Sequence, residues 1–133
     1  MPLPDKPTLQ MAFVTTRLPI AARSLEIPKS IMLGGAAAGP VPFKVPVTLV
    51  HVWICGTQGK YDFAFDVYAP NGRRMGLSNQ EAIVGQFTND GIPTFICYHD
   101  VDLLVEGSGP FEIEVLCDEE VVLRYPFMMM VSS

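Results

Sequence analysis

The stretches FKVPVTLVHVWIC at residues 43–55 and YDFAFDVYA at residues 61–69 decide the fold of this 133-residue chain. From Val47 onward the first stretch is apolar on both faces, which predicts a strand that is covered on both sides. The second stretch places Tyr, Phe, Phe and Val on one face and two Asp on the other, the alternation of a half-buried strand. Pro70-Asn71-Gly72 follows as a strong turn signal, so the centre of the chain predicts β-structure.

The same signals recur on both sides of this central region. Strands are expected at 9–16, 92–105, 111–117 and 121–131, with a short one at 82–87 and a tight acidic hairpin at 118–120. The fold class is therefore predicted to be all-β, an antiparallel β-sandwich, immunoglobulin-like or jelly-roll-like, with about seven to eight short strands.

The first forty residues give weaker signals than the rest. Residues 1–8 hold three prolines and predict an extended N-terminal arm, leaving 9–133 as a single sandwich domain. A short helix is expected at 20–27, between two prolines. The run GGAAAG at 34–39 is expected to be a flexible connector without regular structure.

Charge is sparse and unevenly placed along the sequence. Charged residues make up 17% of the chain, against about 25% in a typical domain, which suggests apolar surface covered by a partner. The net charge of −5 argues against a nucleic-acid partner. Residues 1–60 carry six basic and two acidic side chains, giving +4, and residues 61–133 carry three basic and twelve acidic, giving −9. Either the two halves interleave and the charges average out, or the domain packs basic face to acidic face.

Several features bear on location and cofactors. No segment reaches the roughly 18 apolar residues that span a membrane, and the N-terminus does not read as a secretory signal. Three cysteines without a CxxC pair leave at least one free thiol, which suits a reducing cytoplasm. No nucleotide, phosphate-loop or hydrolase motif is present, so no cofactor is expected.

Three pieces of sequence share a layout with a known family: Val41-Pro42-Phe43, the run 61–72, and GPFEIEVLCDEEVVLRYPF at 109–127. Together they resemble a family of small bacterial β-sandwich proteins known only as a domain of unknown function. The resemblance covers residues 40–130 and implies the fold. Because that family carries no catalytic motif to transfer, the resemblance implies no site.

The run from Cys97 to Asp102 holds the residue types of acid–base and metal chemistry. Alternation places Cys97 and His99 on one face among apolar residues. Two interpretations follow: a histidine packed in the core, or a Cys/His dyad of a metal- or thiol-dependent hydrolase. If strands 43–55 and 92–105 lie side by side, His51 and Cys55 could join them in a four-ligand soft metal site. A second candidate site is a calcium site formed by four carboxylates: Asp100, Asp102, Asp118 and Glu120. The alternative interpretation is that these carboxylates form an acidic rim exposed to solvent.

The favoured function is a non-catalytic one. We expect a β-sandwich that acts by protein–protein interaction or self-assembly, as a homo-oligomer or a subunit of a larger complex. The alternatives are a ligand-binding module for carbohydrate or calcium and, third, the hydrolase. The predicted binding surface combines the second apolar face of strand 43–55 with the outward Tyr68 and with two methionines that share a face and are either core or contact residues. Its members are Val50, Val52, Ile54, Tyr68, Met128 and Met130.

Overall fold

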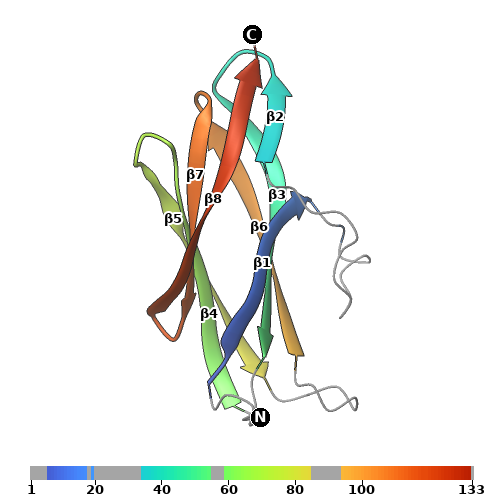
Figure 1. Cartoon of the computed structure of the whole chain (residues 1–133), viewed down its shortest axis with the longest axis vertical. Coiled ribbons are helices and arrows are strands. Elements are labelled where there is room, and N and C mark those ends of the chain that lie inside the picture. The colour runs from blue at the N-terminus through green and yellow to red at the C-terminus, as the bar shows by residue number, and fades with distance from the viewer. Residues whose placement is uncertain (1–5, 18, 20–33, 55–58, 85–93, 133) are drawn as a thin grey trace.

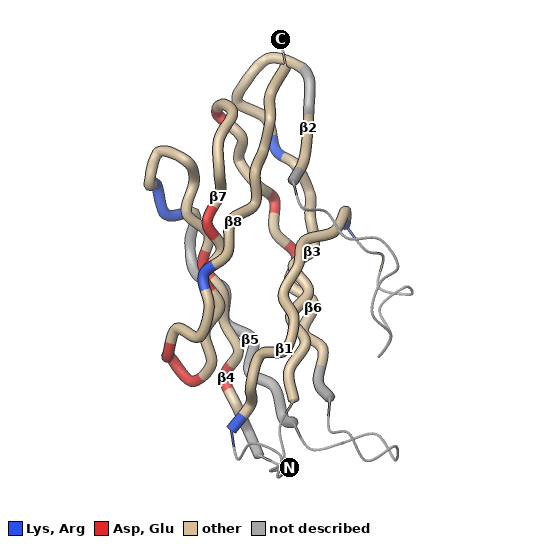
Figure 2. Tube along the Cα trace, in the orientation of Figure 1, with Lys and Arg blue, Asp and Glu red and all other residues tan. Residues whose placement is uncertain are grey.

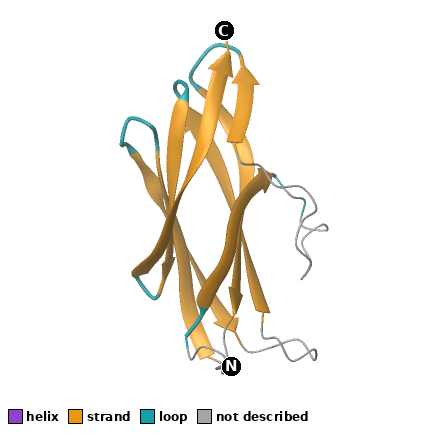
Figure 3. Ribbon diagram, in the orientation of Figure 1, coloured by secondary structure: helices purple, strands orange, loops and turns teal. Residues whose placement is uncertain are grey.

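The computed structural model describes residues 6–17, 19, 34–54, 59–84 and 94–132. The helix expected at 20–27, most of the arm at 1–8 and Cys55 lie outside these residues. All regular elements in the described part are strands, which confirms the all-β prediction (Figure 3). They are β1 (Thr8–Thr16), β2 (Gly34–Ala38), β3 (Phe43–Ile54), β4 (Gly59–Tyr68), β5 (Arg74–Val84), β6 (Thr94–Val105), β7 (Gly109–Cys117) and β8 (Glu120–Ser132).

The strands form two sheets (Figure 1). One has three strands in the order β1-β3-β6, and the other has five in the order β2-β8-β7-β4-β5. Neighbouring strands are antiparallel in every pair except β2 and β8, which run parallel. Within the described residues no helix is long and apolar enough to cross a membrane.

Strand β2 corrects the expectation of a flexible connector at 34–39. Gly34–Ala38 pairs with Met128–Ser132, and the Gly39 N–H donates a hydrogen bond to the Ser132 carbonyl. A strand ladder is made by backbone groups, so the open edge of β8 holds a Gly/Ala segment that has little strand propensity of its own. Strand β5 is also longer than the short strand expected at 82–87, and it begins at Arg74.

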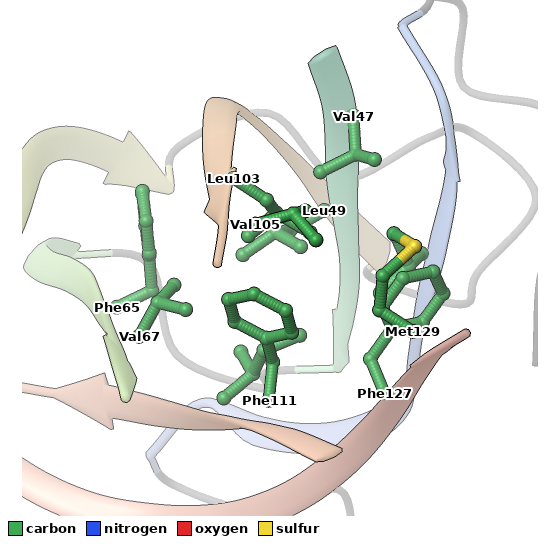
Figure 4. Close-up of a cluster of buried hydrophobic side chains, with 11 residues drawn as sticks. Val47, Leu49, Phe65, Val67, Leu103, Val105, Phe111, Phe127 and Met129 are labelled. Carbon is green, nitrogen blue, oxygen red and sulfur yellow. The ribbon is translucent and has the colours of Figure 1, made fainter. Parts of the chain in front are cut away.

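The largest core cluster contains residues from both sheets (Figure 4). In β7 and β8 the alternate residues Phe111, Ile113, Phe127 and Met129 are buried, as the period of two in their sequence predicts. The remaining members come from β1, β3, β6 and β4: Val14, Val47, Leu49, Leu103, Val105, Phe65 and Val67.

The acidic hairpin is a two-residue turn. Cys117 pairs with Glu120, and the two residues between them, Asp118 and Glu119, have φ angles of +49° and +68°. This left-handed pair is the turn that matches the twist of a hairpin, although Asn-Gly is its usual sequence. Asp118 also anchors the turn to β4, because its carboxylate accepts from the Asp62 N–H while its own N–H donates to the Asp62 carbonyl.

Candidate functional site

An exposed apolar strip lies on the outer face of β8. Side chains of Phe127 and Met129 point into the core, while those of Met128 and Met130 are 44% and 55% exposed. Pro110 of β7 is the register partner of Met128, and Ala36 of β2 is that of Met130, and both are exposed. We call these four residues, Pro110, Ala36, Met128 and Met130, the outer apolar strip.

The other predicted binding residues lie in different surroundings. Val50 is fully buried and Val52 nearly so, in a cluster on the three-stranded sheet with Phe13 and Ile96. Val50 sits on the central strand between Phe13 and Tyr98, its partners on β1 and β6, whose larger side chains flank it. Ile54 and Tyr68 are half-buried. Of the six predicted residues, Met128 and Met130 are therefore the ones that the structure places on the surface.

A guanidinium group occupies the acidic pair that was expected to bind calcium. Arg17 Nη2 lies 2.9 Å from Asp102 Oδ1, and Arg17 Nε lies 3.4 Å from Asp100 Oδ1. Arg17 also donates to the carbonyls of Val47 and Val101, so it ties the end of β1 to β3 and, across β3, to β6. The arginine supplies the positive charge that a cation would bring.

The other two predicted carboxylate ligands lie on the opposite sheet. Asp118 holds the hairpin turn, and Glu120 is exposed at the start of β8. In the part of the chain that the structure describes, no group of three or more His, Cys, Asp or Glu is arranged to hold a metal ion.

A histidine pair lies buried between the two sheets. The rings of His51 on β3 and His99 on β6 are 5.1 Å apart, and His51 Nε2 lies 3.1 Å from the Tyr125 hydroxyl on β8. Burial lowers the pKa of His99 to about 4, and burial with the neighbouring His99 lowers the pKa of His51 well below its usual value. Burial also raises the pKa of Tyr125. All three groups are therefore neutral near pH 7, and the pair packs as part of the core.

Cys97 lies next to His51 in register and is also buried. Desolvation raises the pKa of the Cys97 thiol far above its usual value, despite an opposing effect of Trp53. A nucleophilic cysteine needs a lowered pKa, so this environment favours packing over thiolate chemistry. Of the four residues predicted to form a soft metal site, His51, Cys97 and His99 are buried in the same interior. The fourth, Cys55, lies outside the described residues.

Sequence reasoning missed a buried ion pair on the five-stranded sheet. Asp66 was expected to point into solvent, yet it is fully buried and pairs with Arg74, which is 58% exposed and covers it. On β7, Glu114 is the register partner of Asp66 and is buried as well, with Arg124 Nη2 2.9 Å from its Oε2. The signal in the sequence was an acidic residue on the polar face of each of two alternating strands, with arginines on the strands beside them.

Opposite charges interleave across the molecule (Figure 2). Each arginine in the described residues has a carboxylate within 4 Å, including Arg73 with Glu106 at 3.3 Å. Of the two charge patterns left open by the sequence, this pairing favours the one in which the charges average out.

A pocket of about 440 Å³ lies between two turns at one end of the sheets. The turn after β4 contributes Ala69, Pro70 and Asn71, and the turn before β7 contributes Glu106, Gly107 and Ser108. The Ser108 hydroxyl in the lining of this pocket already takes part in a hydrogen bond, because its Oγ accepts from the Val131 N–H. This pocket is where the ligand-binding alternative would place a small molecule.

Comparison with known proteins identifies a fold relative and no family. No family model matches the sequence, and none of the curated proteins matches it. Among solved structures, the alkylpurine DNA glycosylase AlkC of Pseudomonas fluorescens, bound to DNA containing an abasic site analogue, matches with a TM-score of 0.56 and 9% identity. The match covers 93% of this chain and 30% of the glycosylase chain, so the chain spans less than a third of that protein's length.

This match corrects one expectation from the sequence. The net charge of −5 was taken to exclude a nucleic-acid partner, and that exclusion was wrong, because a chain of this fold occurs in a protein bound to DNA. Net charge describes the whole chain, whereas contact with a phosphate backbone depends on local groups. At 9% identity, what the likeness shows is a shared fold.

Proposed function

We propose that the two sheets pack as an immunoglobulin-like sandwich. The order β1-β3-β6 corresponds to strands A-B-E of that fold, and β2-β8-β7-β4-β5 corresponds to A′-G-F-C-C′. The core cluster that both sheets share supports this arrangement. The same strand order favours the immunoglobulin-like fold over the jelly roll, the other type expected from the sequence.

We propose that this chain is a non-catalytic interaction module that binds a protein through the outer apolar strip. The observation that carries the proposal is the exposure of Met128 and Met130 side by side on β8, with apolar residues on both neighbouring strands. Methionine side chains adapt to the shape of a partner, and exposed apolar surface is stabilised when a partner covers it. His51, Cys97 and His99 support the same proposal, since these three groups are buried and neutral near pH 7.

Site-specific photo-crosslinking in the producing cells tests this role. A photoreactive phenylalanine analogue would replace Met128, and in a matched control it would replace Gln10, which is exposed on β1. We expect a discrete protein adduct at position 128 and none at position 10, with loss of the adduct when Met130→Ser is added. Equal labelling at both positions, or no adduct at either, would overturn the proposal.

A second candidate function is contact with nucleic acid as a module of a larger protein, which the likeness to the DNA-bound glycosylase favours. Among the arginines that form ion pairs in the described residues, Arg73 on the turn between β4 and β5 is the most exposed. Fluorescence anisotropy with a labelled duplex containing an abasic-site analogue tests this function. Binding that weakens steeply with salt and with Arg73→Glu would support it, and unchanged anisotropy at low salt would count against it.

A further inference from the structure

Within the described part of the chain, β2 is the terminal strand of the five-stranded sheet, and no other described strand pairs with its outer edge. Its sequence is Gly-Gly-Ala-Ala-Ala. Natural edge strands are usually blocked by lysine, proline, a bulge or an inward charge, because a free edge pairs with other strands. Strand β2 has none of these features.

The backbone direction shows which groups face the open edge. The Gly39 N–H donates to Ser132 of β8, so at a period of two the backbone groups of Gly35 and Ala37 also face β8. Those of Gly34, Ala36 and Ala38 therefore point away from β8. Three residues thus present N–H and C=O groups to a further strand.

The two segments that form this edge, β2 with the turn after it and the end of β8, carry no charged side chain. The segments 34–43 and 125–132 contain no Asp, Glu, Lys or Arg, although the chain as a whole has a net charge of −5. Two copies can therefore approach at this corner without placing like charges against each other, and the small residues of β2 leave room for close contact. In Figure 2 the acidic hairpin lies at the other end of β8, away from β2.

We propose that β2 pairs antiparallel with β2 of a second copy of this chain, which joins the two five-stranded sheets into one continuous sheet. This inference deepens the proposed interaction role and rests on it. Ala36 is the middle residue of β2, so a two-fold axis with full overlap sets Ala36 opposite Ala36 of the second copy. The three outward residues of each copy would then exchange about six hydrogen bonds. The outer apolar strips of both copies lie on the same face of the joined sheet, which doubles the surface offered to a partner.

Sedimentation velocity over about 1 µM to 1 mM chain tests the pairing. Ala36→Pro removes an N–H that faces the edge and leaves the hydrogen bonds to β8 in place, while the control Ala36→Ser keeps that N–H. We expect the parent and the serine variant to dimerise and the proline variant to stay monomeric, all with the same circular dichroism spectrum. A monomeric parent over the whole range, or a proline variant that dimerises like the parent, would overturn the inference.

A charge exchange tests the two-fold axis independently of any proline effect. Ala36→Lys and Ala36→Glu should each be monomeric, because each places like charges opposite each other, and an equimolar mixture should form the heterodimer. A mixture that stays monomeric while the parent dimerises would overturn this register.

The photo-crosslinking experiment separates this inference from the proposed function. A monomeric parent that still gives a protein adduct at position 128 would remove the self-pairing and leave the interaction role. A parent dimer with no adduct other than a second copy would keep the self-pairing and remove a different protein as the partner.

Discussion

The outer faces of the two sheets both carry apolar stripes, but they differ in access to solvent. On the three-stranded sheet Val50 and Val52 are buried beneath their neighbours, whereas on the five-stranded sheet Met128 and Met130 are open. The faces also differ in how they treat charge. Arg17 bridges two partly exposed carboxylates on the first, while Arg74 covers the fully buried Asp66 on the second.

The difference teaches that an apolar pattern identifies a stripe without showing whether it is covered. On the central strand Val50 is buried between its register partners Phe13 and Tyr98, and Phe13 is itself almost fully buried. Strand β8 has the small side chains of the Gly/Ala strand β2 on one side, and its residues Met128 and Met130 are exposed. The first stripe is therefore part of the buried interior, and the second is open to solvent.

The largest expected difference in the free energy of unfolding is between alanine substitutions on the two outer faces. Phe13→Ala should lower the free energy of unfolding by about 3–5 kcal/mol, because it leaves a cavity beside Val50. Met128→Ala should change it by less than about 0.5 kcal/mol, since that side chain is exposed. Urea denaturation of both variants measures the contrast, and equal losses would break the comparison between the faces.

Removing the arginine of the buried ion pair should cost more stability than removing the arginine of the exposed one. Arg74→Gln should cost about 3 kcal/mol, because it leaves the Asp66 carboxylate buried without its partner. Arg17→Gln should cost no more than about 1 kcal/mol, because Asp100 and Asp102 remain in contact with water. Thermal denaturation at matched pH tests this order, and a larger loss for the Arg17 variant would reverse the assignment of the buried pair.

Acid should weaken the interior that joins the two faces. His99 is neutral in the folded protein, with its pKa lowered to about 4, whereas an unfolded histidine takes up a proton below about pH 6.5. Stability is therefore complete above about pH 6.5 and falls as the pH drops towards 4, by about 2 kcal/mol at pH 5 for this group alone.

Melting temperature against pH measures this loss, with His99→Phe as the comparison. The variant keeps a ring beside Phe65 but has no proton to bind, so its curve should be flatter between pH 6.5 and 4. Parallel curves for the parent and the variant would assign the acid sensitivity to other groups.

The smallest effect should be a gain in the hairpin that leads into the exposed face. Glu119 has a φ of +68°, a conformation that costs a residue with a side chain about 1 kcal/mol relative to glycine. Glu119→Gly should raise the free energy of unfolding by about 0.5–1 kcal/mol. Glu120→Gly is the control, because Glu120 is already in β8, and it should be neutral or destabilising. A gain for the control alone would contradict the turn assignment.

The sequence predicted much of the fold and part of the candidate site. Period-two alternation located β4 and β7 and the inward side chain Phe111, because burial of one face selects that pattern. The hairpin signal located β8, and the sequence put Met128 and Met130 on one face of it, either as core residues or as a contact surface. It did not find β2, because Gly and Ala carry no alternation, and it placed Asp66 in solvent, because a cross-strand arginine cannot be seen from one strand.

By itself, then, the sequence determined which segments are strands and which of their faces are apolar, since these follow from local side-chain order and turn chemistry. Only the tertiary structure decided how β2 joins β8, that Arg17 occupies the acidic pair, and that the two histidines meet between the sheets. Each of these depends on the register between segments far apart in the chain. That register is set by packing of the whole core and not by any one strand.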